Sequence, residues 1–62
     1  MQVRIYDIDN NGNETLRTEA DLRECFPDDD NEFGRAFAYL RQFSRYYAGG
    51  AAAPLVLLMK AE

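Results

Sequence analysis

The stretch from Asp7 to Glu19, DIDNNGNETLRTE, carries oxygen-bearing side chains at a spacing suited to calcium. An EF-hand loop needs Asp or Asn at its positions 1, 3 and 5, Gly at position 6, and a bidentate Glu at position 12. Counting from Asp7, the first half of this pattern is present and ends at Gly12. Position 12 is Thr18, which offers one neutral oxygen where two charged oxygens are needed. We therefore expect a hairpin turn here and no metal site.

Side chains that support catalysis are scarce in this chain. The sequence contains no His, so a Ser or Cys nucleophile lacks its usual base. The single Cys25 excludes an internal disulfide, and a zinc site would have too few ligands. Gly49-Gly50 follows a predicted helix, whereas a phosphate-binding loop precedes one. We expect a protein that is not an enzyme and that uses no metal or other cofactor.

Acidic residues are the clearest charged feature. Residues 1–33 carry ten Asp or Glu and three Arg, a net charge of −7, whereas residues 34–62 have a net charge of +3. Closely spaced carboxylates can imitate the regular negative charge of a nucleic-acid backbone and compete for a protein's basic groove. The alternative is that these acids cap helices and keep a small protein soluble. The residues predicted to contact a partner are Asp28, Asp29, Asp30, Glu32, Asp21 and Glu24.

A second candidate surface is basic and aromatic. Arg and Tyr side chains that could bind nucleic acid through phosphate contacts and base stacking recur at helical spacing in the second half of the chain. The competing interpretation is a solvated helix face on which Arg35 pairs with Glu32. The surface consists of Arg35, Tyr39, Arg41 and Arg45, with Gln42 and Tyr46 beside them.

The elements that would position these residues begin with a β-hairpin. Residues 3–8 are rich in β-branched and aromatic side chains, and apolar residues alternate with Arg4. Asn11-Gly12 can adopt the positive φ angles of a tight turn. Residues 14–17 then form a short, charged edge strand.

Two helices are predicted to follow the hairpin. Thr18 resembles the N-cap of the first helix, which would carry Glu19, Asp21 and Glu24 and end at Pro27. Asp29 and Glu32 resemble a capping box at the start of the second helix, which we expect to run to about Ala48. The core face of the second helix would consist of Phe33, Phe37, Leu40, Phe43 and Tyr47. Because Tyr46 and Tyr47 are adjacent, only one of them can face the core.

A short apolar run at residues 55–59, after a connector at 51–54, predicts a buried last strand. The order β-β-α-α-β predicts an α+β fold, a single domain of residues 1–62 in which a three-stranded antiparallel sheet carries two helices on one face. We expect the last strand to lie beside the first, which makes the first strand central. No apolar run reaches the ~20 residues of a membrane-spanning helix, and the N-terminus lacks an apolar signal core, so we expect a soluble protein.

Three segments carry a resemblance to a known family: the hairpin QVRIYDIDNNGNETLRT, the acidic stretch EADLRECFPDDDNE and the aromatic helix that ends in YYAGG. Through these segments the whole chain resembles the small phage-encoded anti-CRISPR proteins, in particular the type I-C inhibitors. The resemblance implies a non-enzymatic inhibitor in the cytoplasm of the bacterial host cell, which binds a type I CRISPR surveillance complex and blocks target DNA as a DNA mimic.

The positive second half of the chain departs from a full DNA mimic. Either one face alone mimics DNA, or the contact with the partner is of another kind. We expect a monomer without direct nucleic-acid or membrane contacts. Two alternatives stay open, a small nucleic-acid-binding module that uses the Arg and Tyr surface, and a phage accessory protein without a DNA-related role.

Overall fold

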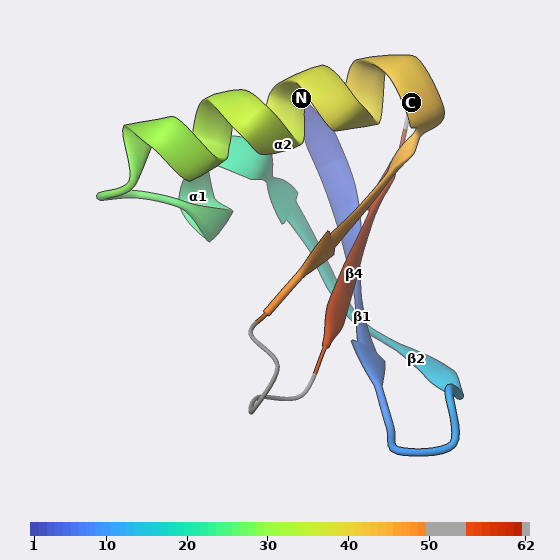
Figure 1. The fold of residues 1–62 in the computed structure, drawn as a ribbon. Coiled ribbons are helices and arrows are strands. Elements are labelled where there is room, and N and C mark those ends of the chain that lie inside the picture. Colours follow the sequence, from blue (N-terminus) through green and yellow to red (C-terminus); the bar gives the residue numbers. More distant parts are fainter. Residues whose placement is uncertain (50–54, 62) are drawn as a thin grey trace.

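The computed structural model describes residues 1–49 and 55–61 (Figure 1). The four strands form one antiparallel sheet in the order β2-β1-β4-β3. The predicted α+β class and the central position of the first strand beside the last are confirmed, but the predicted three-stranded sheet is wrong. The elements are β1 (Gln2–Ile8), β2 (Glu14–Asp21), α1 (Leu22–Cys25), α2 (Asp30–Phe43), β3 (Arg45–Ala48) and β4 (Val56–Lys60).

The β1–β2 hairpin closes at the predicted place, through a turn built around Asp9, but of the Asn11-Gly12 pair only Gly12 adopts a positive φ. The Asp9 Oδ1 atom accepts hydrogen bonds from the N–H groups of Asn11 and Asn13, each at 2.9 Å. Gly12 adopts a φ of 82° and donates its N–H to the Asp9 carbonyl at 3.0 Å. The carboxylate of the calcium-like motif therefore organises the turn.

The second strand is longer than predicted and the first helix is shorter. The ladder between β1 and β2 continues until Asp21 lies opposite Gln2, so Thr18 is a strand residue and does not cap a helix. Asp21 is the N-cap of α1 instead, and its Oδ1 accepts from the N–H of Arg23 at 2.9 Å. The prediction failed because β1 provides a pairing partner along its whole length, which outweighs the weak helical preference of a short segment.

The start of α2 is as predicted, but its end is not. The Asp29 side chain caps the helix by accepting from the N–H of Glu32 at 2.9 Å. The helix ends at Phe43 because Ser44 adopts a left-handed backbone with φ 64° and ψ 6°. The Ser44 carbonyl then accepts from the Lys60 N–H at 3.1 Å, which begins the pairing of β3 with β4. Residues 45–48, predicted as helix, are therefore the fourth strand.

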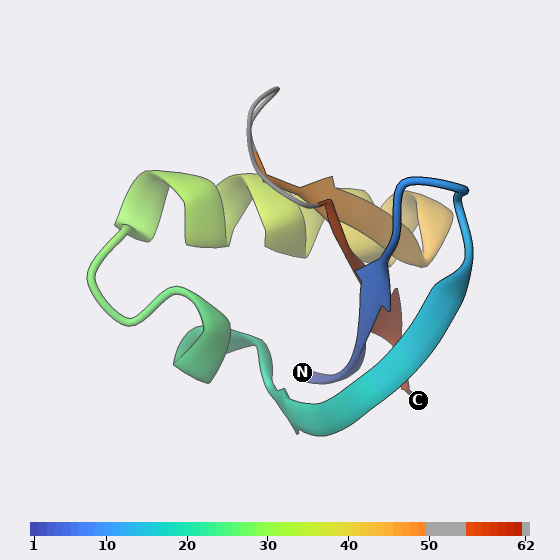
Figure 2. The same cartoon turned by 90° about the horizontal axis from the view of Figure 1, so that it is seen from below.

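Both helices pack on the same face of the sheet, and the core lies between them and the strands (Figures 1 and 2). Leu40 is fully buried as predicted, and Phe33 and Phe37 are half-buried. The buried residues of this core come from all elements except β2: Val3, Leu22, Ala36, Leu40, Tyr46 and Leu58.

The predicted core face of the second helix is wrong at its C-terminal end. Phe43 is 59% exposed because α2 ends at that residue. Side chains alternate between the two faces of a strand, so Tyr46 in β3 points to the core and Tyr47 points away. The expectation that only one of the two tyrosines faces the core is confirmed, although the buried tyrosine is Tyr46 and not Tyr47.

The last strand forms as predicted, shifted by one residue to Val56–Lys60. The predicted connector at 51–54 lies outside the described residues. Within residues 1–49 and 55–61, neither helix is long and apolar enough to cross a membrane.

Candidate functional site

Five of the predicted contact residues gather around the connection between α1 and the start of α2 (Figure 1). Arg23 holds this region together. Its Nη2 atom donates to Asp30 Oδ1 at 2.6 Å and to the Pro27 carbonyl at 3.3 Å. Its guanidinium carbon also lies 4.9 Å from the centroid of the Phe33 ring. We call this region the acidic end, which consists of Glu24, Asp28, Asp29, Asp30 and Glu32.

Three carboxylates of the acidic end also stabilise the fold. Asp29 caps α2, Asp30 pairs with Arg23, and Glu32 accepts from the Tyr46 hydroxyl at 3.2 Å. The carboxylates of Glu24 and Asp28 make no hydrogen bond or ion pair within the described part of the chain. A carboxylate can cap a helix or pair with an arginine and still lie at the surface, as the Asp30 side chain does. The structural and functional interpretations of this cluster are therefore compatible.

The sixth predicted contact residue, Asp21, has a different position. It lies at the junction of β2 and α1, where its Oδ2 atom is 3.4 Å from the N-terminal ammonium group. Glu19, predicted on the same helix, lies in β2 and pairs with Arg4 at 3.4 Å. The predicted helix face that carries Glu19, Asp21 and Glu24 is wrong, because α1 begins only at Leu22.

Stability should fall at acidic pH because three carboxyl groups are more acidic in the fold. Hydrogen bonds from the Arg17 side chain, the Asn13 N–H and the Arg23 N–H lower the pKa values of Asp7, Asp9 and Asp21 below 3.8. A lowered folded-state pKa stabilises the fold above the unfolded pKa of about 3.9, and this contribution is lost as the pH falls through the folded-state value. We expect a nearly constant melting temperature from pH 7 to about 5 and a decrease below about pH 4.

The Asp21→Asn variant provides the control for this pH dependence. Asn can still cap α1, but it cannot titrate. Melting curves recorded by circular dichroism at pH 7 and pH 3 should show a smaller decrease for this variant than for the natural chain. An equal decrease in both proteins would show that Asp21 does not contribute to the acid sensitivity.

The predicted basic and aromatic surface is divided by the end of α2. Arg35, Tyr39 and Arg45 line one groove, but Arg41 lies elsewhere, with its guanidinium carbon 5.8 Å from the Phe37 ring centroid. The groove forms because β3 returns beside α2 after the turn at Ser44. Sequence periodicity missed Phe43 and Tyr47 as groove residues because it placed both in the core. We call this groove the edge groove, and its lining is Arg35, Tyr39, Phe43, Arg45, Tyr46 and Tyr47.

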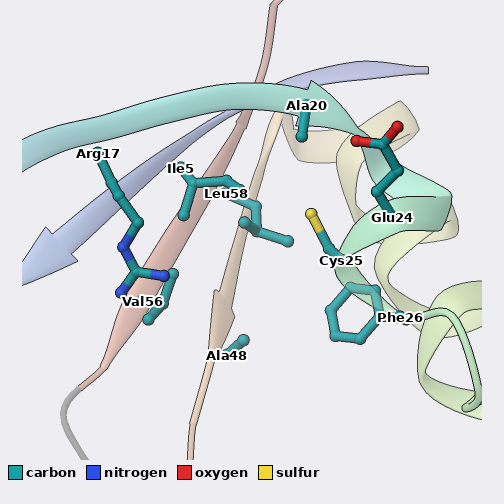
Figure 3. Close-up of a pocket in the computed structure, with 9 residues that line it drawn as sticks. All are labelled: Ile5, Arg17, Ala20, Glu24, Cys25, Phe26, Ala48, Val56 and Leu58. Carbon is teal, nitrogen blue, oxygen red and sulfur yellow. The ribbon is translucent and has the colours of Figure 1, made fainter.

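A second hollow of about 460 Å³ lies between the sheet and α1 (Figure 3). Arg17 and Glu24 approach it from opposite sides, and the remaining lining is mostly apolar. Burial, together with the nearby charges of Glu24 and Asp21, raises the pKa of the Cys25 thiol, so this thiol stays protonated at neutral pH. The hollow has room for a small apolar group and presents no activated nucleophile. Its lining is Ile5, Arg17, Ala20, Glu24, Cys25, Phe26, Ala48, Val56 and Leu58.

No protein-family model matches this sequence, and neither a curated protein nor a solved structure with significant similarity was found.

Proposed function

We propose that this chain is a non-enzymatic inhibitor that binds a basic nucleic-acid groove of another protein through the acidic end. The observation that supports this proposal is the concentration of five carboxylates on two adjoining elements that Arg23 holds together. The short helix α1, the start of α2 and the connection between them present these charges over a short distance, as the phosphates of a nucleic acid do.

The exposure of these side chains fits a long-range electrostatic role. The Asp30 side chain is 84% exposed although it pairs with Arg23. Exposed charges contribute little to folding stability, but they accelerate the encounter with a partner of opposite charge. Such an interaction should weaken as the salt concentration rises, because dissolved ions screen exposed charges.

The partner that we propose is a type I CRISPR surveillance complex in the cytoplasm of a bacterial host cell. This choice comes from the resemblance to the type I-C inhibitors, which bind proteins that hold DNA in a positively charged channel. The chain would occupy part of that channel and exclude target DNA. Only the acidic end would mimic DNA, because the C-terminal half of the chain carries a net positive charge.

A competition assay tests the proposal. A labelled DNA duplex that carries the target sequence is bound to a purified type I-C complex, and its release by the chain is followed by fluorescence anisotropy. The variant Glu24→Gln/Asp28→Asn/Asp29→Asn/Asp30→Asn removes four charges and leaves an amide at position 29 that can still cap α2. We expect its inhibition constant to rise at least roughly tenfold, because each lost charge contact costs a fraction of a kcal/mol or more.

Two double variants, each of which removes two negative charges, separate the effect of the acidic end from the effect of the net charge of the chain. Glu24→Gln/Asp28→Asn should weaken inhibition, whereas Asp9→Asn/Glu14→Gln, which removes two charges near the hairpin turn, should leave it nearly unchanged. Unchanged inhibition by a folded four-residue variant would exclude the acidic end as the contact surface. If the natural chain releases no DNA at low salt, the proposed inhibition of this complex is wrong.

A further inference from the structure

We propose that the edge groove binds an extended acidic peptide segment of another protein, which adds a strand to the free edge of β3. The groove has a volume of about 420 Å³ and lies between α2 and β3. Its residues differ from those of the acidic end, so this inference does not depend on the proposed inhibitor function.

The backbone of β3 offers the hydrogen-bonding groups that an added strand requires. Among the strands of residues 1–49 and 55–61, β3 is the outermost, and β4 is its neighbour on one side only. The Lys60 N–H donates to the Ser44 carbonyl, and antiparallel pairing alternates from there. The N–H and C=O groups of Arg45 and Tyr47 therefore point away from β4. A free strand edge of this kind is a template for β-augmentation.

The groove follows this edge. Tyr46 and Tyr47 point to opposite faces of the sheet, yet both line the groove. Arg45 also lines it, so the groove accompanies three of the four residues of the outer strand. Figure 1 shows β3, in orange, turning back from the end of α2 and running below the helix, with an increasing separation from it toward the end of the strand.

Exposed aromatic rings are concentrated at the groove. Tyr39, Phe43 and Tyr47 are 48%, 59% and 51% exposed, and the other large apolar side chains with comparable exposure in the described ranges are Leu16 and Leu55. The Tyr39 ring centroid lies 5.5 Å from that of Phe43 and 5.7 Å from that of Tyr46. Clustered aromatic side chains that are open to solvent are typical of protein interfaces and can bind apolar side chains of the added strand.

The charge of the groove selects an acidic segment. Arg35 and Arg45 both line it, and neither forms an ion pair with an acid within the described ranges. A second copy of this chain would bring two such pairs of arginines together, which disfavours self-pairing through β3. A nucleic acid would suit the arginines and the rings, but it lacks the alternating N–H and C=O groups with which an extended peptide can form a ladder along the edge of β3.

The first test uses a library of fluorescein-labelled heptapeptides in which Asp or Glu alternates with Phe, Leu or Val. We expect saturable binding of library members in fluorescence anisotropy. Tyr39→Ala and Arg45→Glu should each weaken binding roughly tenfold, as expected for central interface residues. Leu16→Ala is the matched control, because Leu16 is 53% exposed and lies outside the groove. This variant should bind the peptides unchanged.

The second test examines the backbone pairing. N-methylation of the peptide at alternate residues should abolish binding in one register and leave it intact in the other, because only alternate N–H groups face β3. Hydrogen exchange of the Arg45 and Tyr47 amides, followed by NMR, should slow when the peptide binds.

Four results would overturn the proposal. One is the absence of binding by every library member, and another is equal binding of both N-methylated series. The third is preferential binding of a labelled oligo-dT to the same groove, which would make it a nucleic-acid site. The fourth is protection of the Arg45 and Tyr47 amides in the free protein together with a doubled molecular mass, which would identify a second copy as the occupant.

Discussion

Replacing Leu40 with Ala is expected to lower the free energy of unfolding by about 2–5 kcal/mol. Leu40 is fully buried and belongs to the core cluster that joins α2 to β1, β3 and β4. Loss of the side chain removes buried apolar surface and leaves a cavity that the surrounding strands cannot fill completely. A domain of 62 residues has a total stability of roughly 3–9 kcal/mol. Urea denaturation followed by circular dichroism should therefore show a midpoint far below that of the natural chain, and a natural stability near the lower limit would leave the variant partly unfolded without denaturant.

Phe43→Ala is the matched control on the same helix. Although Phe is larger than Leu, Phe43 is 59% exposed at the end of α2, so its loss should cost less than about 1 kcal/mol. A destabilisation as large as that of Leu40→Ala would place Phe43 in the core. That result would support a helix that continues beyond residue 43 and would contradict the fold described above.

Replacing Ser44 with Gly is expected to stabilise the protein by up to about 1 kcal/mol, whereas Ser44→Val should destabilise it by roughly 1–2 kcal/mol. Ser44 has a φ of 64°, a region that Gly adopts without steric cost and that β-branched residues avoid. Thermal melts of both variants, compared with the natural chain, measure the two effects.

Whether Ser44→Gly stabilises or destabilises the protein distinguishes a fold in which α2 ends at Phe43 from one in which it continues to Ala48. If α2 continued to Ala48, as its residue pattern predicts, Gly at position 44 would lie inside a helix and destabilise it by roughly 0.5 kcal/mol relative to Ser. Stabilisation supports the left-handed helix end and the fourth strand. Destabilisation would contradict both, and it would also remove the edge groove, since that groove exists only if residues 45–48 form β3.

The sequence alone determined the features that depend on strong local signals. Asn11-Gly12 predicted the hairpin turn, and Asp29 with the acidic first turn predicted the start of α2. Apolar alternation and the run at residues 55–59 predicted the first and last strands and their adjacency. The composition of the acidic end was also evident, because five of its predicted residues are close in the sequence and remain together in space.

The tertiary structure decided the features for which local signals were weak or misleading. Residues 18–21 carry a helix-start pattern, but they are strand because β1 provides a partner for each of them. Residues 45–48 continue the aromatic period of α2, and no Gly or Pro lies directly before them, at residues 41–44, to mark an end. They become β3 because pairing with β4 offers backbone hydrogen bonds and burial of Tyr46, which together outweigh one further helical turn.

The edge groove is a further feature that local sequence patterns predicted only in part. Helical spacing correctly placed Arg35 and Tyr39 on one exposed surface, but it also included Arg41 and assigned Phe43 and Tyr47 to the core. The chain reversal at Ser44 brings Arg45, Tyr46 and Tyr47 beside α2. This reversal depends on contacts between residues that are distant in the sequence, and a local periodicity carries no information about such contacts.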